Sequence, residues 1–325
     1  MKTLVTGATG FAGSHLTRKL VGLGHEVRIL VRSQSNIRQF GNLDLDVVVG
    51  KIEIPADVDK AARDRELVYH LAANYRVAGV KDDVYWQTNL EGTKNVVDAS
   101  LRHGIEHLIH CSTVGVHGRI TDPPANERTA YAPGDIYQRS KTEAEKIVRR
   151  AINEEKLPAT IFRPAAIYGP GDTRLLKLFR AIKRRRFMMI GSGEVLYHLI
   201  YVNDLVDGIL CCSDRDPRGQ VYILAGDDYV RLKDLVRMIA STLQVPIPRL
   251  RLPVWPVYGA AAVCELVCKQ LRVEPPLYRR RLDFFRKDRA FEITKAKREI
   301  GFAPRVPLEQ GIASTANWYL EHGWI

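Results

Sequence analysis

The sequence predicts an α/β fold in which a doubly wound parallel sheet is joined to a smaller, interleaved C-terminal lobe. Short apolar runs alternate with amphipathic stretches through the first half, which is the rhythm of strand–helix–strand units. Runs such as 67–71 and 107–111 are mostly apolar, as expected of strands that are buried on both faces. After Pro164, turns and prolines become dense, which indicates a second lobe of different texture.

Each element follows from this pattern. We expect strands at 2–6, 26–31, 46–49, 67–71, 107–111 and 159–163, and helices at 11–23, 57–64, 84–103 and 136–154. The apolar run at 197–202 and the residues that follow it suggest that the chain returns to the first lobe. We therefore assign residues 1–167, plus roughly 195–225, to the first lobe and residues 168–194 and 226–325 to the second.

Length and composition bound the class of protein. The chain has 325 residues, of which 46% are hydrophobic and 26% charged, an ordinary globular balance. No apolar run approaches the ~20 residues that span a bilayer, and no secretory signal pattern opens the chain, so we expect a cytoplasmic protein. The five cysteines lie mostly in apolar stretches. Their spacing suits neither a disulfide framework nor a zinc site, so no metal is predicted.

Positive charge is concentrated in two segments. Lys and Arg total 49 against 37 Asp and Glu, a net charge of +12. The basic residues gather at 177–186 and 279–289. A solvated helix face is the simplest interpretation, and a site for an anionic substrate or a membrane surface is the alternative. No nucleic-acid-binding motif accompanies the charge, so a nucleic-acid partner is not expected.

Three glycines follow the first predicted strand. Gly7, Gly10 and Gly13 fall where that strand turns into the helix at 11–23. Gly7 can adopt backbone angles that a side chain would forbid, Gly10 leaves room for a ligand, and Gly13 allows the helix to pack closely on the strand. The free N–H groups of a helix start favour a pyrophosphate. The run therefore predicts a dinucleotide site.

A tyrosine and a lysine share one face of the helix at 136–154. Tyr137 and Lys141 are four residues apart, the spacing of neighbours on a helix. A nearby ammonium favours the phenolate and brings the pKa of a tyrosine closer to neutrality. Ser112 and Thr113 follow the strand at 107–111, so that a hydroxyl there can hydrogen-bond a substrate carbonyl or alcohol.

Several motifs occur in the order of a known family. They are the glycine run at 6–13, His70-Leu71-Ala72-Ala73, Ser112-Thr113, Tyr137 with Lys141, and Arg163-Pro164. Together they resemble the extended short-chain dehydrogenase/reductases, which include NAD-dependent epimerases/dehydratases and enzymes like 3β-hydroxysteroid dehydrogenase. The resemblance covers essentially the whole chain. It implies a Rossmann-type dinucleotide-binding domain in the first lobe and a substrate-binding second lobe.

The resemblance also implies roles for individual residues. Tyr137 would be the acid/base, Lys141 would hold the nicotinamide ribose, and Thr113 would orient the reacting oxygen. We choose Thr113 over Ser112 by its spacing to Gly118. Asn89 matches an asparagine of mainly structural role. The full set of expected cofactor-binding residues is Gly7, Thr9, Gly10, Phe11, Ala12, Arg32, Lys51, Ile52, Leu71, Ala72, Ala73, Asn89, Tyr137, Lys141, Pro164 and Ala166.

The end of the second strand bears on the choice of cofactor. An acidic residue there would hold the adenosine ribose and select NAD, but this chain has Arg32 followed by Ser33. A guanidinium suits a 2′-phosphate. Lys51 stands where the family usually carries an aspartate that contacts adenine. These residues favour NADP(H), with NAD(H) as the alternative if Arg32 only stacks on adenine.

The substrate is less closely indicated. The segment Arg163 to Gly169 resembles enzymes that act on secondary alcohols of hydrophobic, steroid- or lipid-like molecules more than it resembles sugar-nucleotide enzymes. Val114 and Gly115 follow Thr113 where 4,6-dehydratases of this family carry an acidic pair. We therefore predict an alcohol/ketone oxidoreductase. A nucleotide-sugar 4-epimerase is the alternative within the family, and a non-catalytic NADP-binding sensor or scaffold is the alternative of another class.

The stretch 254–264 is free of charge and flanked by basic residues. A buried helix of the second lobe is the favoured interpretation, and peripheral contact with a membrane or a place in the wall of a hydrophobic pocket are the alternatives. Related enzymes pair through the helices at 84–103 and 136–154, so the resemblance also implies a homodimer.

Overall fold

A seven-stranded parallel sheet forms the centre of the larger lobe. The computed structural model describes residues 1–75, 81–215, 217–271 and 282–325. The strands follow the order β10-β6-β5-β4-β1-β2-β3, and every neighbouring pair is parallel. The predicted α/β class is confirmed. The strands are β1 (Lys2–Thr6), β2 (Glu26–Val31), β3 (Asp46–Val49), β4 (Leu67–His70), β5 (His107–Cys111), β6 (Ala159–Pro164) and β10 (Val221–Leu224).

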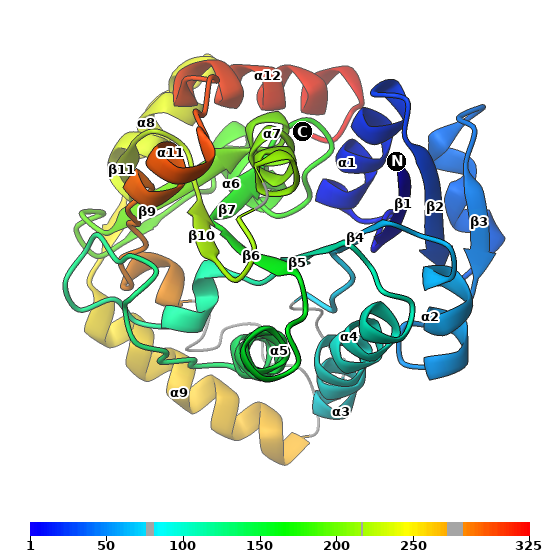
Figure 1. Cartoon of the computed structure of the whole chain (residues 1–325). Helices are drawn as coiled ribbons and strands as arrows, with labels where there is room; N and C mark the ends of the chain where they lie inside the picture. Colours follow the sequence, from blue (N-terminus) through cyan, green and yellow to red (C-terminus); the bar gives the residue numbers. More distant parts are fainter. Residues whose placement is uncertain (76–80, 216, 272–281) are drawn as a thin grey trace.

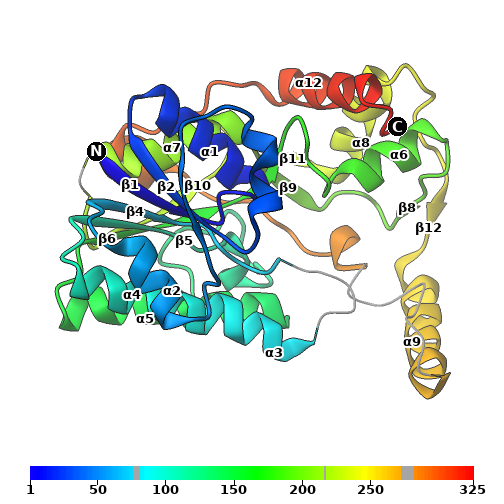
Figure 2. The same ribbon diagram turned by 90° about the vertical axis from the view of Figure 1, so that its right-hand side faces the viewer.

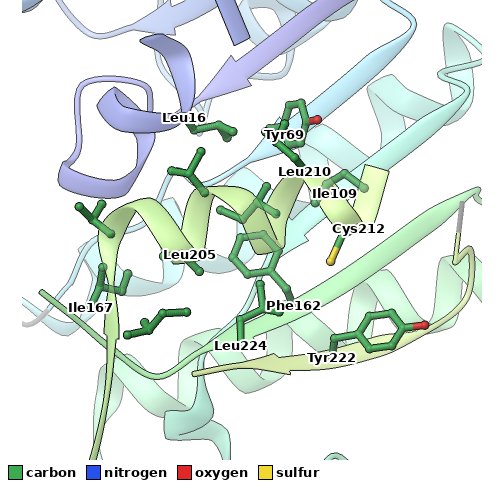
Figure 3. Close-up of a cluster of buried hydrophobic side chains, with 14 of the residues drawn as sticks. Leu16, Tyr69, Ile109, Phe162, Ile167, Leu205, Leu210, Cys212, Tyr222 and Leu224 are labelled. Atoms are coloured by element: carbon green, nitrogen blue, oxygen red, sulfur yellow. The ribbon is translucent and has the colours of Figure 1, made fainter. Parts of the chain in front are cut away.

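Helices cover both faces of this sheet (Figures 1 and 2). On one face lie α1 (Phe11–Gly22) and α7 (Val202–Asp214), packed on the sheet through the cluster drawn in Figure 3, which includes Leu16, Phe162 and Leu205. On the other lie α2 (Pro55–Ala62), α4 (Gly92–Arg102) and α5 (Ile136–Glu154), over Leu4, Val68 and Leu108. Burial on both faces explains why the central strands are apolar runs.

The helix expected at 84–103 is interrupted. It begins as α3 (Asp82–Tyr85), widens into a π-helical turn at Trp86–Glu91 and continues as α4. Hydrophobic periodicity does not distinguish such a turn from an α-helix, and π turns of this kind are often found at functional sites. This turn carries Asn89, which is fully buried.

The smaller lobe is built on short strands. One sheet joins β7 (Ala166–Tyr168), β9 (Leu196–Tyr201) and β11 (Tyr229–Arg231), and β8 (Met189–Ile190) pairs with β12 (Arg251–Leu252). Their core includes Phe179, Leu235 and Tyr319. Between these elements the chain returns to the large sheet through α7 and β10, so the lobes interleave. The helices are α6 (Leu176–Lys183), α8 (Leu232–Thr242), α9 (Val254–Leu271), α11 (Thr294–Ile300) and α12 (Leu308–Glu321).

Helix α9 stands at the periphery of the smaller lobe in both views (Figures 1 and 2). The expectation that the stretch 254–264 is buried is wrong, because Trp255 is 76% exposed and Val263 is more than half exposed. The composition of the stretch indicated a need for burial, but the lobe packs little against this helix. Within the described residues, no helix combines the length and hydrophobicity required to cross a bilayer.

Candidate active site

The glycine turn adopts the geometry that its sequence predicts. Gly7 has a φ of +75°, and a side-chain carbon there would stand 2.6 Å from the Ala72 backbone nitrogen. A side-chain carbon on Gly13 would stand 2.1 Å from the Gly7 carbonyl oxygen. The β1–α1 turn therefore packs directly against the segment after β4, and neither glycine tolerates a side chain.

The start of α1 is suited to an anion. Its N-cap residue is Gly10, no side chain caps the first turn, and that turn contains no acidic residue. The first N–H groups of a helix have no partner within it, and the helix dipole adds positive potential there. Among the described residues, a side-chain carbon at Gly10 would approach only the Gly7 carbonyl oxygen, at 3.2 Å. The residues present therefore fit a pyrophosphate.

The other predicted cofactor residues lie along one edge of the sheet. Parallel strands bring their carboxyl ends to the same edge. Arg32 is exposed just after β2, and Lys51 is exposed just after β3. Thr9 lies in the glycine turn, where its carbonyl accepts from Gln39. The remaining members end a strand, follow one or lie at the start of the next element: Phe11, Ala12, Ile52, Leu71, Ala72, Ala73, Pro164 and Ala166.

The two predicted hydroxyls meet at this edge. The Tyr137 hydroxyl is hydrogen-bonded to the side chain of Thr113, whose Oγ1 also accepts from the Gly115 N–H at 3.0 Å. Tyr137 is in the first turn of α5, which Asp135 caps by accepting from the Gln138 N–H. One turn later, Lys141 Nζ donates to the Cys111 carbonyl at 2.6 Å. A substrate oxygen placed beside Thr113 and Tyr137 would meet two hydroxyl groups.

The pKa of Tyr137 differs from the sequence expectation. Burial raises this pKa, and the opposing contributions come from the positive charge of Arg174 and the hydrogen bond with Thr113. Lys141, whose Nζ donates to a carbonyl of β5, is not among the main influences on this pKa, so the expected lowering by Lys141 is not found. Burial also lowers the pKa of Lys141. Tyr137 therefore retains its proton at neutral pH.

A buried polar network lies behind the two hydroxyls. Ser112 donates from Oγ to Glu145 Oε2 at 2.5 Å, so its hydroxyl is engaged in this network. Arg163 donates from Nε and Nη2 to the two carboxylate oxygens of Glu145, at 3.0 and 2.5 Å. Burial would raise the pKa of Glu145, but the bonds and charge of Arg163, helped by Ser112 and Tyr131, hold it below its usual value. The network joins β5, β6 and α5.

Asn89 connects the segment after β4 to α5. Its Oδ1 accepts from the Asn74 N–H at 2.7 Å, and its Nδ2 donates to Ser140 Oγ at 2.9 Å. Asn89 thus holds the α5 face beside Tyr137, a position that fits the structural role implied by the resemblance.

Sequence reasoning missed two residues beside Tyr137. The Tyr75 ring meets the Tyr137 ring edge-on, with 4.9 Å between the ring centroids. The Arg174 guanidinium carbon lies 4.2 Å from the centroid of the Tyr75 ring. Tyr75 follows the motif His70 to Ala73, and Arg174 follows the segment Arg163 to Gly169. This proximity to two motifs was the only signal in the sequence.

The comparisons with known proteins agree with this geometry. The profile of the "NAD dependent epimerase/dehydratase family" matches residues 3–225. A 2-alkyl-3-oxoalkanoate reductase of Stenotrophomonas maltophilia is 28% identical, over 96% of this chain and 97% of its own. Isoform 2 of a 3β-hydroxysteroid dehydrogenase/decarboxylase of Arabidopsis thaliana is 30% identical over 96% of this chain and 61% of its own length. The crystal structure of gox2253 is 32% identical, with a TM-score of 0.85 over 100% of this chain and 99% of that one.

Proposed function

Because the chain belongs to the NAD dependent epimerase/dehydratase family, we propose that it is an NAD(P)-dependent oxidoreductase that interconverts a secondary alcohol and a ketone on a hydrophobic, steroid- or lipid-like substrate. The observation that carries the proposal is the grouping of Tyr137, Thr113 and Lys141 at the carboxyl edge of β5, where Lys141 Nζ donates to the Cys111 carbonyl at 2.6 Å and Tyr137 interacts with Thr113. It supports the proposal because a proton donor and an orienting hydroxyl would then lie beside the edge where the glycine turn would hold a dinucleotide.

Each residue has a distinct part in this proposal. A bound nicotinamide would supply or accept the hydride. In the reducing direction, Thr113 orients the ketone oxygen, and Tyr137 gives its hydroxyl proton to that oxygen as the alcohol forms. Lys141, in contact with the backbone of β5, is placed one turn from Tyr137 to hold a ribose hydroxyl.

The relatives support a hydrophobic substrate. The two reported above are named for a 3-oxoalkanoate and for a 3β-hydroxysteroid. Epimerase activity on a nucleotide sugar is the second candidate, since the name of the family includes it. Dehydration is disfavoured because Val114 and Gly115 follow Thr113.

Turnover measurements distinguish the two candidates. We expect the purified protein to oxidise NADPH in proportion to added hydrophobic ketone. With UDP-glucose we expect neither isomerisation of the sugar nor consumption of the cofactor. Isomerisation of the nucleotide sugar without net NADPH oxidation, together with no reduction of the ketones, would refute the oxidoreductase proposal in favour of the epimerase.

We also propose a preference for NADP(H), supported by the exposed Arg32 after β2 and Lys51 after β3. Arg32→Ala should raise the KM for NADPH by about 30-fold, because charge-assisted hydrogen bonds to a 2′-phosphate are lost. The KM for NADH should change less than about twofold. Steady-state kinetics with both cofactors measure this, with Arg63→Ala, an exposed arginine after α2, as the control. Equal losses with both cofactors would contradict the assignment.

We further propose that the protein binds anionic membranes peripherally through a surface that we call the α9 corner. This surface consists of exposed apolar residues: Met188, Ile247, Leu250, Trp255, Val263, Leu266 and Val267. The β8–β12 pair joins the start of this set to α9, because the Met189 N–H donates to the Leu250 carbonyl. Exposed arginines border it at 184–186, 249 and 251. A lipid surface matches both features, since its headgroups take the charge and its acyl boundary takes the apolar side chains.

Leu266→Asp should weaken binding to phosphatidylglycerol-containing vesicles by about tenfold, because a charge replaces an apolar contact at the interface. Co-sedimentation with those vesicles and with pure phosphatidylcholine vesicles measures this. Leu23→Asp, a substitution of an equally exposed leucine at the end of α1, is the matched control and should bind like the wild type. Recovery of the wild type wholly in the supernatant would end the proposal.

A further inference from the structure

An arginine lies next to the proposed reaction centre with no role in that proposal. The Arg174 guanidinium covers the Tyr75 ring, and the Tyr75 ring contacts the Tyr137 ring edge-on. The same charge acts on the Cys111 thiol. Burial raises the pKa of this thiol, and the charges of Lys141 and Arg174 offset part of the increase. Arg174 therefore stands beside both the catalytic helix and the carboxyl end of β5.

The backbone around Arg174 is held in place. Asp172, which is 1% exposed, accepts the N–H groups of Arg174 and Leu175 with its two carboxylate oxygens, both at 2.9 Å. The Tyr319 hydroxyl donates to the Asp172 carbonyl at 2.6 Å. The nearest acid is thus engaged with backbone donors. In the part of the chain that the structure describes, no ion pair neutralises the Arg174 guanidinium.

The aromatic side of the pair is anchored as well. Asn74 donates its backbone N–H to Asn89 and its side-chain amide to Thr88, which fixes the segment that leads into Tyr75. A guanidinium stacked on a fixed ring keeps its N–H edge available and loses little entropy when it binds a planar anion. The pair is a pre-organised anion site next to Tyr137.

We propose that Arg174 binds a carboxylate carried by the substrate close to the reacting carbon, so that the substrate class is a 3-oxo or 3-hydroxy acid with an apolar remainder. This inference rests on the proposed oxidoreductase function. In such an acid the carboxyl carbon is two bonds from the carbinol carbon, so one molecule can present its oxygen to Tyr137 and Thr113 and its carboxylate to Arg174.

A carboxylate fits better than the diphosphate of a nucleotide sugar. The described residues place one free guanidinium beside Tyr137, which balances a single negative charge, and its planar fork matches the two oxygens of a carboxylate. A diphosphate carries two charges and is separated from the sugar carbon that an epimerase oxidises by most of the sugar ring.

The test compares an acid with its neutral ester. We would measure NADP⁺ reduction by 3-hydroxydodecanoate and by its methyl ester, with wild type, Arg174→Met, Arg174→Lys and Arg286→Met. Arg174→Met should lower kcat/KM for the acid by about 50-fold and for the ester by less than about threefold, because only the acid loses a charge-assisted bidentate contact. Arg174→Lys should recover part of the loss, since it keeps the charge without the fork.

Arg286→Met is the matched control. Arg286 also stacks on an aromatic ring, that of Tyr258 in α9 at 4.9 Å, and its removal should treat acid and ester alike. Binding can also be measured without turnover. We would titrate 3-hydroxydodecanoate calorimetrically into the NADP⁺-loaded Tyr137→Phe variant, with and without Arg174→Met. The added Arg174→Met substitution should abolish the binding.

The outcomes separate this inference from the proposed function. If wild type oxidises acid and ester equally well and Arg174→Met changes neither, the carboxylate site is refuted while the oxidoreductase stands. If neither compound is oxidised and no hydrophobic ketone is reduced, the proposed function falls, and the inference falls with it.

Discussion

Replacing Tyr137 by phenylalanine is expected to lower kcat for ketone reduction about 1000-fold, the usual contribution of a positioned proton donor. The substitution removes one oxygen and its hydrogen bond with Thr113, whereas the contact of its ring with Tyr75 does not require the hydroxyl. The KM values and the melting temperature should therefore change little. Steady-state kinetics and thermal unfolding of the same preparation measure both.

The same tyrosine predicts a difference between the two directions of reaction. Burial raises the pKa of Tyr137, so the hydroxyl holds its proton through the neutral range and is ready to protonate a forming alcohol. The oxidising direction needs the deprotonated form, whose population grows with pH. We expect the reduction rate to be flat between about pH 6 and 8 and the oxidation rate to rise across the same range.

Tyr222→Phe is the control for this prediction. Tyr222 is also buried and donates its hydroxyl to Glu299, but it lies on β10 at the edge of the sheet. Its loss should leave kcat within about twofold. If Tyr137→Phe retained full activity, the acid/base role would be wrong, and a scaffold or sensor that only binds the cofactor would become the better interpretation.

The sequence predicted the parts of the site that depend on local backbone chemistry. Gly118 has a φ of +59°, and a side-chain carbon there would overlap the Ala132 carbonyl oxygen. A glycine is therefore required at that turn, and its spacing selected Thr113 as the hydroxyl that faces Tyr137. Ser112, one residue earlier, has a different partner, because its hydroxyl donates to Glu145. Alternation of side chains along extended backbone makes such a choice predictable.

The parts that the sequence did not predict depend on contacts between distant segments. Tyr75 and Arg174 meet only because the loops after β4 and β7 converge, and neither residue has a spacing that signals the other. The error over α9 has a different origin. Apolar composition indicates that a surface tends to be covered, but it carries no information on whether this lobe, a membrane or another molecule covers it.

Arg163 gives the second large effect, this time on stability. It is 1% exposed and Glu145 is fully buried, and besides the two bonds to the carboxylate, Arg163 donates to the Glu127 carbonyl and the Tyr131 hydroxyl. Removing Arg163 leaves the buried Glu145 carboxylate poorly compensated, because its remaining described ion-pair partner is the partly exposed Arg149, at 3.7 Å. Arg163→Met should lower the free energy of unfolding by about 3–5 kcal/mol. Urea denaturation at pH 7 measures the loss.

The double variant Arg163→Met/Glu145→Leu tests the cause of that loss, because it removes both charges. Replacing a buried pair by apolar groups is often close to neutral, so the double variant should be clearly more stable than Arg163→Met. A double variant no more stable than Arg163→Met would show that lost packing, not the stranded carboxylate, is responsible.

The pH dependence of the Arg163→Met variant follows from the same pair. In the wild type the pKa of Glu145 is held below its usual value, so the folded state binds fewer protons than the unfolded chain, and this stabilisation is lost as the pH falls through the lowered pKa. Without Arg163, burial becomes the dominant influence and raises the pKa of Glu145. The folded variant then binds a proton that the unfolded chain lacks. Its stability therefore increases as the pH falls towards the pKa of this carboxyl in the unfolded chain. The deficit relative to wild type should therefore shrink between about pH 7 and pH 5, and a deficit independent of pH would mean that Glu145 is not the group left unpaired.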